Sequence, residues 1–230
     1  MNSPAVQTSS QDAPDARLVA GRSPLAQLLH ALNQPLTGLQ CSMEVTLATP
    51  RTPEQYVRCL REGLELTERM RALVEALREV TDLGEEKNER QETIELKSVL
   101  RETVEDLKPV AEVKNVRITL DCPETFRVAV SAGRRTLGGA VFRFLESAVS
   151  LAARDNGLLV ETASDPAGAC LRVRWQMGRP ASAFSRPELG LLVARAGFER
   201  AGAVWQRERS ETFETVTVRL PDVAENRSHP

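Results

Sequence analysis

The sequence carries almost no excess charge, because 30 Lys and Arg residues stand against 32 Asp and Glu residues. A dedicated nucleic-acid-binding protein usually has a basic surplus, so we expect no nucleic-acid partner. No run of apolar residues approaches the roughly 20 that a membrane-spanning helix needs, so we expect no membrane span. The 230 residues are nevertheless 41% hydrophobic. That amount is enough for one large or two small domains with a real core.

Cysteine is also scarce and is not arranged for metal binding. The four cysteines are scattered, with no Cys-x-x-Cys pair: Cys41, Cys59, Cys122 and Cys170. We therefore expect no zinc site and no other bound metal, and we interpret the cysteines as free thiols of a reducing cytoplasm. The N-terminal stretch "MNSPAVQTSSQDAPDA" lacks the basic start and apolar core of a signal peptide. Its composition predicts a disordered leader over residues 1–21 of a cytoplasmic protein.

Histidine is scarcer still: there are two, and His229 falls in an expected C-terminal tail (222–230). His30 lies in the stretch "LLHALNQPLTGLQ", which has helical periodicity. Six apolar residues share one face of that helix and form a seam suited to a helical bundle: Leu25, Leu29, Leu32, Leu36, Leu39 and Met43. His30 lies on the opposite face with Gln34, Thr37 and Cys41, so we expect it to face solvent.

Two long helices are predicted in the first third of the chain. Ser23 and Pro24 are a start signal for a helix to about Ala48, and Thr52 and Pro53 begin a second helix. Spacings of three and four residues give this second helix its own apolar face: Tyr56, Cys59, Gly63, Leu66, Met70, Leu73, Leu77 and Val80. A hairpin over 22–84 cannot bury both apolar faces alone. Two copies are therefore expected to form a four-helix bundle, that is, a homodimer.

A polar linker (85–92) separates the hairpin from a segment with a different periodicity. Short alternating runs such as "VRITL", "FRVAV" (126–130) and "FETVTVRL" predict strands, while "RRTLGGAVFRFLESAVSLAA" has helical spacing. Strands with interspersed helices over 93–221 predict a two-layer α/β sandwich. The fold class is therefore α plus α/β.

"HALNQPLTGL" resembles the phosphoacceptor box of sensor histidine kinases, in which a Leu, a Pro and a further apolar residue follow the histidine. In that family a dimeric helical hairpin precedes a gyrase-type ATPase domain, which is the order of elements predicted over 23–221. The resemblance implies that His30 accepts a phosphoryl group. The flank expected to meet a partner protein is Ala31, Asn33, Gln34, Pro35, Thr37 and Gly38. The alternative is an incidental kink at Pro35 beside an exposed, inert histidine.

The boxes with which the family binds ATP and magnesium are degenerate here. The acidic residue that usually follows the phosphoacceptor is Ala31. "FRFLESAVSLA" keeps Glu146 but has Ser147 in place of the magnesium-binding Asn, and Arg143 at the preceding Asn position. "QMGRP" replaces the adenine-reading Asp by Gln176 and keeps Gly178. "ELGL" keeps Gly190, and Glu188 is expected to put a negative charge where phosphates would meet a helix N-terminus.

Three functions follow from the resemblance. The first is a dimeric histidine phosphotransferase of a two-component phosphorelay, a pseudo-histidine kinase that passes phosphoryl groups between His30 and receiver-domain aspartates. It needs no cofactor of its own because the receiver brings its magnesium, and Gln34 is a candidate contact for the receiver or for an attacking water. The second is a divergent but active ATP-dependent kinase. The third is a non-catalytic scaffold that docks a receiver domain or a true histidine kinase.

Overall fold

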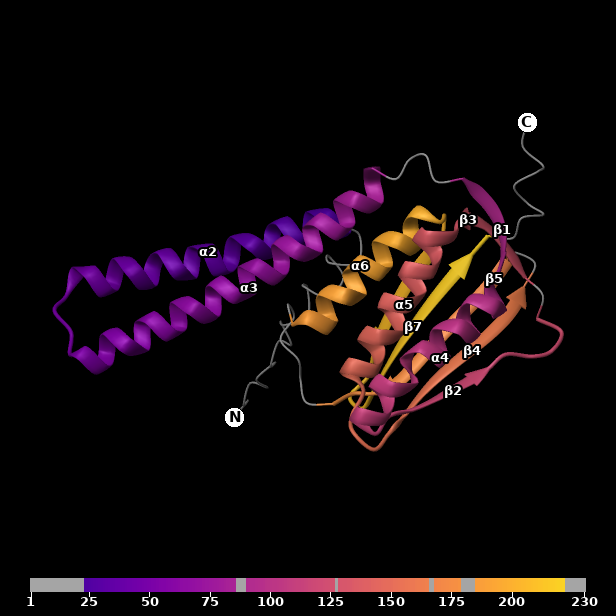
Figure 1. Cartoon of the computed structure of the whole chain (residues 1–230). Coiled ribbons are helices and arrows are strands. Elements are labelled where there is room, and N and C mark those ends of the chain that lie inside the picture. Colours follow the sequence, from indigo (N-terminus) through magenta and orange to yellow (C-terminus); the bar gives the residue numbers. More distant parts are fainter. Residues whose placement is uncertain (1–22, 86–89, 127, 166–167, 179–184, 222–230) are drawn as a thin grey trace, which may run out of the picture.

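The computed structural model describes residues 23–85, 90–126, 128–165, 168–178 and 185–221 (Figure 1). The predicted leader (1–21) and tail (222–230) lie outside these residues, as do residues 86–89 of the predicted linker. A long helical hairpin projects from an α/β domain (Figure 1). Among the described residues, no helix is both long and apolar enough to cross a membrane.

The hairpin consists of α2 (Pro24–Ala48) and α3 (Pro53–Glu85). Both helices begin where the capping residues predicted. The Ser23 hydroxyl accepts a hydrogen bond from the Ala26 amide at 3.3 Å. Thr52 and Gln55 form a reciprocal capping box, in which each side chain accepts a bond from the other residue's amide. These bonds satisfy amides that the first helical turn leaves without partners.

The face that α2 buries differs from the predicted seam. Its buried residues are Pro24, Leu28, Ala31 and Pro35, with Leu32 and Leu39 half-buried. The remaining members of the predicted seam are exposed to between 41% and 56%: Leu25, Leu29, Leu36 and Met43. The buried stripe is therefore rotated toward Ala31 and Pro35, and the hairpin keeps an uncovered apolar flank.

The α/β domain has the predicted order of elements. In chain order they are β1 (Gln91–Glu95), α4 (Leu96–Lys114), β2 (Arg117–Asp121), β3 (Ala129–Gly133), α5 (Arg134–Leu151), β4 (Gly157–Asp165), β5 (Gly168–Gln176), α6 (Arg186–Arg200), β6 (Val204–Arg209) and β7 (Phe213–Leu220). The main sheet has the order β2-β4-β5-β7-β6, parallel between β2 and β4 and antiparallel elsewhere. β1 and β3 form a separate antiparallel pair. Helices α4, α5 and α6 cover one face of the main sheet (Figure 1). The predicted α plus α/β class is confirmed.

Two boundaries in this domain differ from the prediction. β1 begins at Gln91, inside the predicted linker. β3 begins at Ala129 rather than at Phe126, because the Phe126 amide donates to the Pro123 carbonyl at 3.0 Å and closes a turn.

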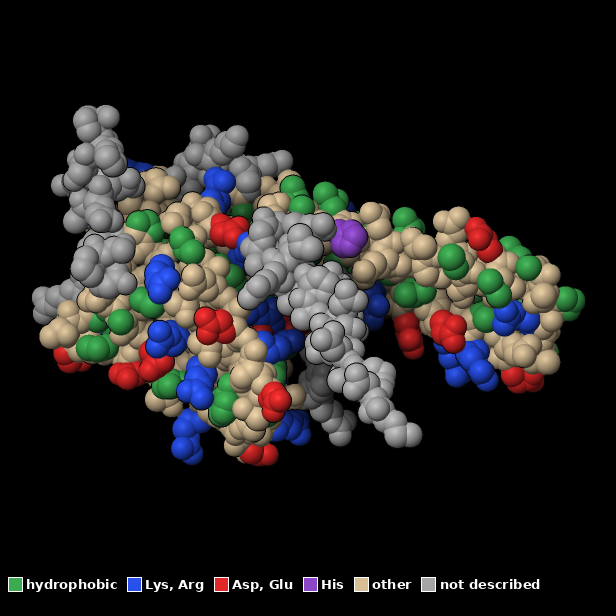
Figure 2. All heavy atoms as spheres, turned by 180° about the vertical axis from the view of Figure 1, so that it is seen from behind, with side chains coloured by type: hydrophobic (Ala, Val, Ile, Leu, Met, Phe, Trp, Pro, Cys, Tyr) green, Lys and Arg blue, Asp and Glu red, His purple; other side chains and the backbone are tan. Residues whose placement is uncertain are grey.

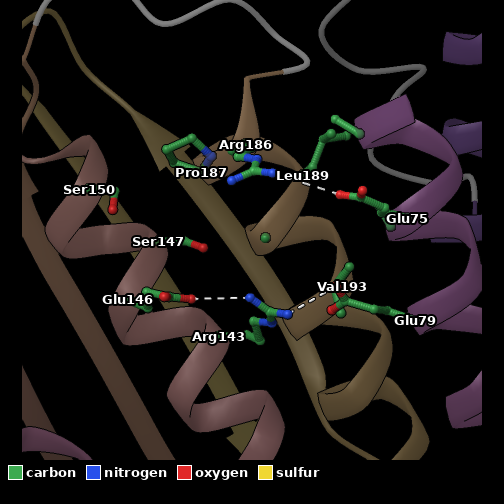
Figure 3. Close-up of a pocket in the computed structure, with 13 residues that line it drawn as sticks. Glu75, Glu79, Arg143, Glu146, Ser147, Ser150, Arg186, Pro187, Leu189 and Val193 are labelled. Carbon is green, nitrogen blue, oxygen red and sulfur yellow. Dashed lines mark hydrogen bonds and ion pairs between the residues drawn. The ribbon is translucent and has the colours of Figure 1, made fainter. Parts of the chain in front are cut away.

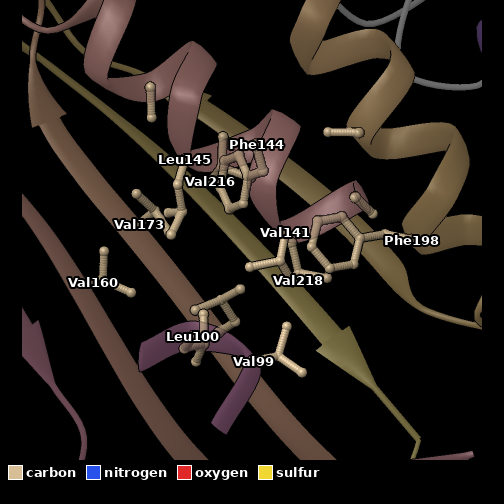
Figure 4. Packing of buried hydrophobic residues seen from close by; sticks show 14 of the residues in the cluster. Val99, Leu100, Val141, Phe144, Leu145, Val160, Val173, Phe198, Val216 and Val218 are labelled. Carbon is tan, nitrogen blue, oxygen red and sulfur yellow. The ribbon is translucent and has the colours of Figure 1, made fainter. Parts of the chain in front are cut away.

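The core lies between the helices and the main sheet (Figure 4). Alternate residues of β5 point into it, so Leu171, Val173 and Trp175 are buried while Arg172 and Arg174 are exposed. From the helix layer, Phe144 packs edge-on against Phe198 and Trp205, with ring centroids 6.0 and 4.9 Å away. This packing fixes α5 and α6 over the sheet, and these two helices carry the degenerate boxes.

Candidate functional site

His30 lies on the exposed side of α2, as predicted. Figure 2 shows its side chain on the surface, close to where the hairpin meets the α/β domain. Asn33, Gln34, Thr37 and Gly38 are exposed on the same helix. The Thr37 hydroxyl donates to the Asn33 carbonyl at 2.9 Å, so it is occupied within the helix. An imidazole in this setting is open to approach by another protein.

Ala31 and Pro35 require a correction. Ala31 has no exposed surface and Pro35 is buried, so neither can contact a partner in this arrangement. For Ala31 the reason is that α6 of the α/β domain packs against this part of the hairpin. A small apolar cluster, named here the docking cluster, joins the two parts of the chain: Leu28, Ala31, Leu73, Ala76, Leu189 and Val193.

Three of the predicted nucleotide-site residues come together in a crevice of about 330 Å³ between α3, α5 and α6. Glu146 and Ser147 of α5 line it, and Gly190 of α6 faces them. Ion pairs cross the crevice (Figure 3). One terminal nitrogen of Arg143 lies 3.0 Å from a Glu79 carboxylate oxygen on α3, and the other lies 3.3 Å from a Glu146 carboxylate oxygen.

The crevice has little room at the position of the lost asparagine. A Cβ placed on Gly190 would lie 2.2 Å from the Ser147 hydroxyl oxygen, and one on Gly197 would lie 2.8 Å from the Ala140 Cβ. Ser147 itself is buried. Helices α5 and α6 therefore approach each other closely along these glycines. The longer amide side chain of an asparagine at 147 would have to displace α6, so this approach of the two helices accommodates serine and not asparagine.

Gln176 and Gly178 lie apart from the crevice. Gly178 lines a second cavity of about 650 Å³ with Lys114, Met177 and Ser185, among others, whereas Gln176 is not among the residues that line either cavity. Alternation along β5 places Gln176 on the sheet face that carries Arg172 and Arg174, away from the helices. Gln176 therefore lies apart from Glu146, Ser147 and Gly190.

Lys114 is the basic group of the second cavity that burial affects most. Its ammonium donates to the carbonyl oxygens of Val149 and Ser150 at the end of α5. Burial, with a smaller contribution from the nearby charge of Arg154, lowers the pKa of Lys114 below its ordinary value. Because this ammonium is already bonded to helix carbonyls, it serves the α5 C-terminus rather than a free anion site.

Glu188 also requires a correction, because its charge does not face the crevice. Its buried carboxylate accepts hydrogen bonds from the Arg207 guanidinium at 2.9 and 3.1 Å and from Arg209 at 3.2 Å. Both arginines also bind Glu214, which is 1% exposed. Burial lowers the pKa of Arg207, but its bonds to Glu188 and Glu214 outweigh that effect and raise it. This network ties the first turn of α6 to β6 and β7.

The described residues offer neither a cluster of metal ligands nor a disulfide. No group of three or more His, Cys, Asp or Glu side chains there could hold a metal ion. All four cysteines are free thiols, as predicted.

Similarity to solved structures identifies the fold of the chain. No protein-family model and no curated protein sequence matches the chain. Among solved structures, the histidine kinase AdeS of Acinetobacter baumannii is similar with a TM-score of 0.54 and 16% identity, over 84% of this chain and 98% of that one. A histidine kinase from Burkholderia phymatum has a TM-score of 0.51 and 16% identity, over 86% and 95%. Full-length ShkA in complex with AMPPNP has a TM-score of 0.53 and 18% identity, over 87% of this chain and 46% of ShkA. The chain therefore has the fold of sensor histidine kinases, a helical hairpin followed by an ATPase-like domain.

Sequence reasoning missed the residues through which the two parts of the chain meet. Glu79 and Glu75 of α3 bind arginines of the α/β domain, and Leu189 and Val193 of α6 pack on the hairpin. The sequence pointed to one residue of this contact, because Arg143 stands where the family has an asparagine. Its partner lies 64 residues away in sequence, beyond the reach of any local pattern.

Proposed function

We propose that this protein is a dimeric histidine phosphotransferase of a two-component phosphorelay, and that His30 carries the phosphoryl group. The observation that supports it best is a contrast within one chain. The His30 side chain is exposed on a helix with polar and small neighbours, whereas α5 and α6 close together where a nucleotide's magnesium would bind. Such a protein needs a phosphoryl donor other than ATP.

An aspartyl phosphate on a receiver domain is a suitable donor. A ring nitrogen of His30 attacks the phosphorus in line, the bond from phosphorus to the aspartate oxygen breaks, and the carboxylate leaves with the electron pair. The receiver supplies the magnesium that offsets the charge of the phosphoryl oxygens. The only task of this chain is to position the His30 imidazole. An open helix face allows the close, in-line approach that such a transfer requires. The exposed Gln34 lies one turn beyond His30 and remains a candidate contact for the receiver or a water.

The dimer part of the proposal rests on the uncovered flank of the hairpin. Large apolar side chains remain exposed along both helices: Leu25, Leu29, Leu36, Met43, Leu47, Val57, Leu60 and Leu64. Figure 2 shows such side chains spread along the hairpin. A groove of about 650 Å³ between the far halves of α2 and α3 has four members of this set in its lining: Met43, Leu47, Leu60 and Leu64. Its length and apolar character suit a second hairpin of the same kind, since a monomer rarely leaves so large a patch in water.

ATP-dependent autophosphorylation is the competing function. The ShkA structure holds AMPPNP, so nucleotide binding is compatible with this fold. Against it stand Ser147 in place of the asparagine and the close approach of Gly190. Calorimetry with ATP and magnesium separates the two functions. We expect no measurable binding, and a micromolar dissociation constant would favour the kinase.

The direct test is incubation with a phosphorylated receiver domain and detection of label on this chain. We expect acid-labile, alkali-stable label that is absent in the His30→Gln variant. The His229→Gln variant is the matched control, because it makes the same substitution at the other histidine and should be labelled normally. Labelling of the His30→Gln variant, or binding of receivers by the unmodified chain without any label, would favour the scaffold function instead.

A further inference from the structure

Arg143, at the earlier of the two asparagine positions of the nucleotide box, forms ion pairs of its own. Arg143 projects from α5 into the crevice and binds Glu79 of α3 at 3.0 Å and Glu146 of α5 at 3.3 Å (Figure 3). Glu146 thereby holds the guanidinium on its own helix, while Glu79 belongs to the hairpin. Arg143 thus connects the α/β domain to the hairpin at the place where the family would bind a nucleotide.

Two further contacts accompany this ion pair. At the start of α6, an Arg186 nitrogen lies 3.9 Å from a Glu75 carboxylate oxygen, one helical turn from Glu79 along α3. Between the two ion pairs, Leu189 and Val193 of α6 pack into the docking cluster. The interface therefore has an apolar centre with a charged pair at each side, which is the usual anatomy of a specific protein contact.

The same contact determines which part of α2 is accessible. Leu28 and Ala31 lie within the docking cluster and Pro35 is buried, although His30 between them is exposed. For a receiver that approaches His30, the polar side of α2 is therefore accessible, whereas α6 covers the apolar side of α2. The docked domain narrows the surface that a partner can use.

We propose that Arg143, Glu79 and the docking cluster form a clasp that holds the degenerate domain on the hairpin and limits access to His30. The gating role rests on the proposed function, whereas the clasp itself does not. An intramolecular contact thus stands where the family binds a nucleotide. Arg143, whose positive charge would repel magnesium, binds Glu79 of the hairpin.

The contacts that form the clasp are weak enough to open. The side chains of Arg143 and Glu79 are 43% and 41% exposed, and half-exposed ion pairs contribute little and weaken with salt. The docking cluster has six buried members, far fewer than the core of the α/β domain. Removal of either component should therefore raise the open population without unfolding the domain.

The test measures opening by thiol labelling. In a background where the four cysteines are serine, a Val193→Cys variant places a thiol of similar size in the docking cluster, where the side chain is 7% exposed. Its labelling rate reports the open population. A Val113→Cys variant at an 85% exposed position gives the unhindered rate, and a Val173→Cys variant in the sheet core reports global unfolding.

Arg143→Glu and Glu79→Arg should each raise the Val193→Cys labelling rate about fivefold, since attraction in a half-exposed pair becomes repulsion. The double variant with both reversals should return toward the original rate. Arg101→Glu, on an exposed pair with Glu124 that does not line the crevice, is the matched control and should change nothing. The Val173→Cys rate should stay constant throughout. The clasp proposal would be overturned by either of two results. One is a Val193→Cys thiol that is labelled at the unhindered rate before any charge is reversed, and the other is a labelling rate that Arg143→Glu leaves unchanged.

The functional arm uses the same variants with a phosphorylated receiver. Both single reversals should accept phosphoryl groups faster, by about the factor seen in thiol labelling. If thiol labelling rises but phosphoryl transfer does not, the clasp does not gate His30 and the proposal fails. If thiol labelling responds as expected but no variant is ever phosphorylated, the clasp stands and the proposed function fails.

Discussion

The close approach of α5 and α6 can be tested by substituting one glycine. Gly197 lies in α6, and a Cβ added there would lie 2.8 Å from the Ala140 Cβ and 3.6 Å from the Ala140 Cα and the Thr136 carbonyl oxygen. None of these atoms is the free end of a flexible side chain. Gly197→Ala must therefore push the two helices apart.

The expected magnitude combines two opposing effects. Overpacking of this kind costs about 1–3 kcal/mol, while replacing a helical glycine by alanine gains about 1 kcal/mol. We expect a net loss of unfolding free energy of up to about 2 kcal/mol. Gly138→Ala is the matched control, because that glycine is in α5 and an added Cβ meets nothing within 4 Å. It should stabilise the protein by up to about 1 kcal/mol.

Urea denaturation of the single variants and of Gly197→Ala combined with Ala140→Gly measures the effect. The combination removes the clashing Cβ, so the double-mutant cycle should show a favourable coupling of about 1 kcal/mol or more. If Gly197→Ala is as stabilising as Gly138→Ala, the helices are not in close contact. An asparagine at position 147 would then meet no steric obstacle from α6.

Two other predictions follow from the structure. Glu188→Ala should lower the unfolding free energy by about 2–4 kcal/mol because it leaves Arg207 short of a buried partner; Lys108→Ala, which breaks an exposed pair with Glu105, should change it by less than about 0.5 kcal/mol in the same urea titration. Leu29→Glu with Leu36→Glu should give folded monomers by light scattering, because both side chains lie on the uncovered flank, and a variant that remains dimeric would refute the proposed interface.

The boundaries of the elements were largely predictable because local chemistry determines them. Ser23 with Pro24 and Thr52 with Gln55 cap the two hairpin helices, and those bonds form between neighbours in sequence. The change from a period of 3.6 to a period of 2 after residue 90 likewise marks the α/β domain. These features predicted the fold class without reference to any distant contact.

What the sequence did not reveal depends on contacts across the chain. α2 has more apolar positions than one neighbour can cover, so periodicity could not decide which of Leu28 and Leu29 is buried. Glu188 was assigned to the crevice because it precedes Gly190, yet arginines of β6 bind it on the other side of α6. In each case the deciding partner belongs to another element.

The central claim is that phosphoryl groups reach His30 from a receiver and not from ATP. The most direct measurement exposes one preparation of the protein to two donors in parallel, labelled ATP with magnesium and a phosphorylated receiver domain, and locates the label by mass spectrometry at neutral pH. We predict label on the peptide that contains His30 with the receiver as donor, and none with ATP. Label from ATP on that peptide, or none from any receiver, would contradict the account.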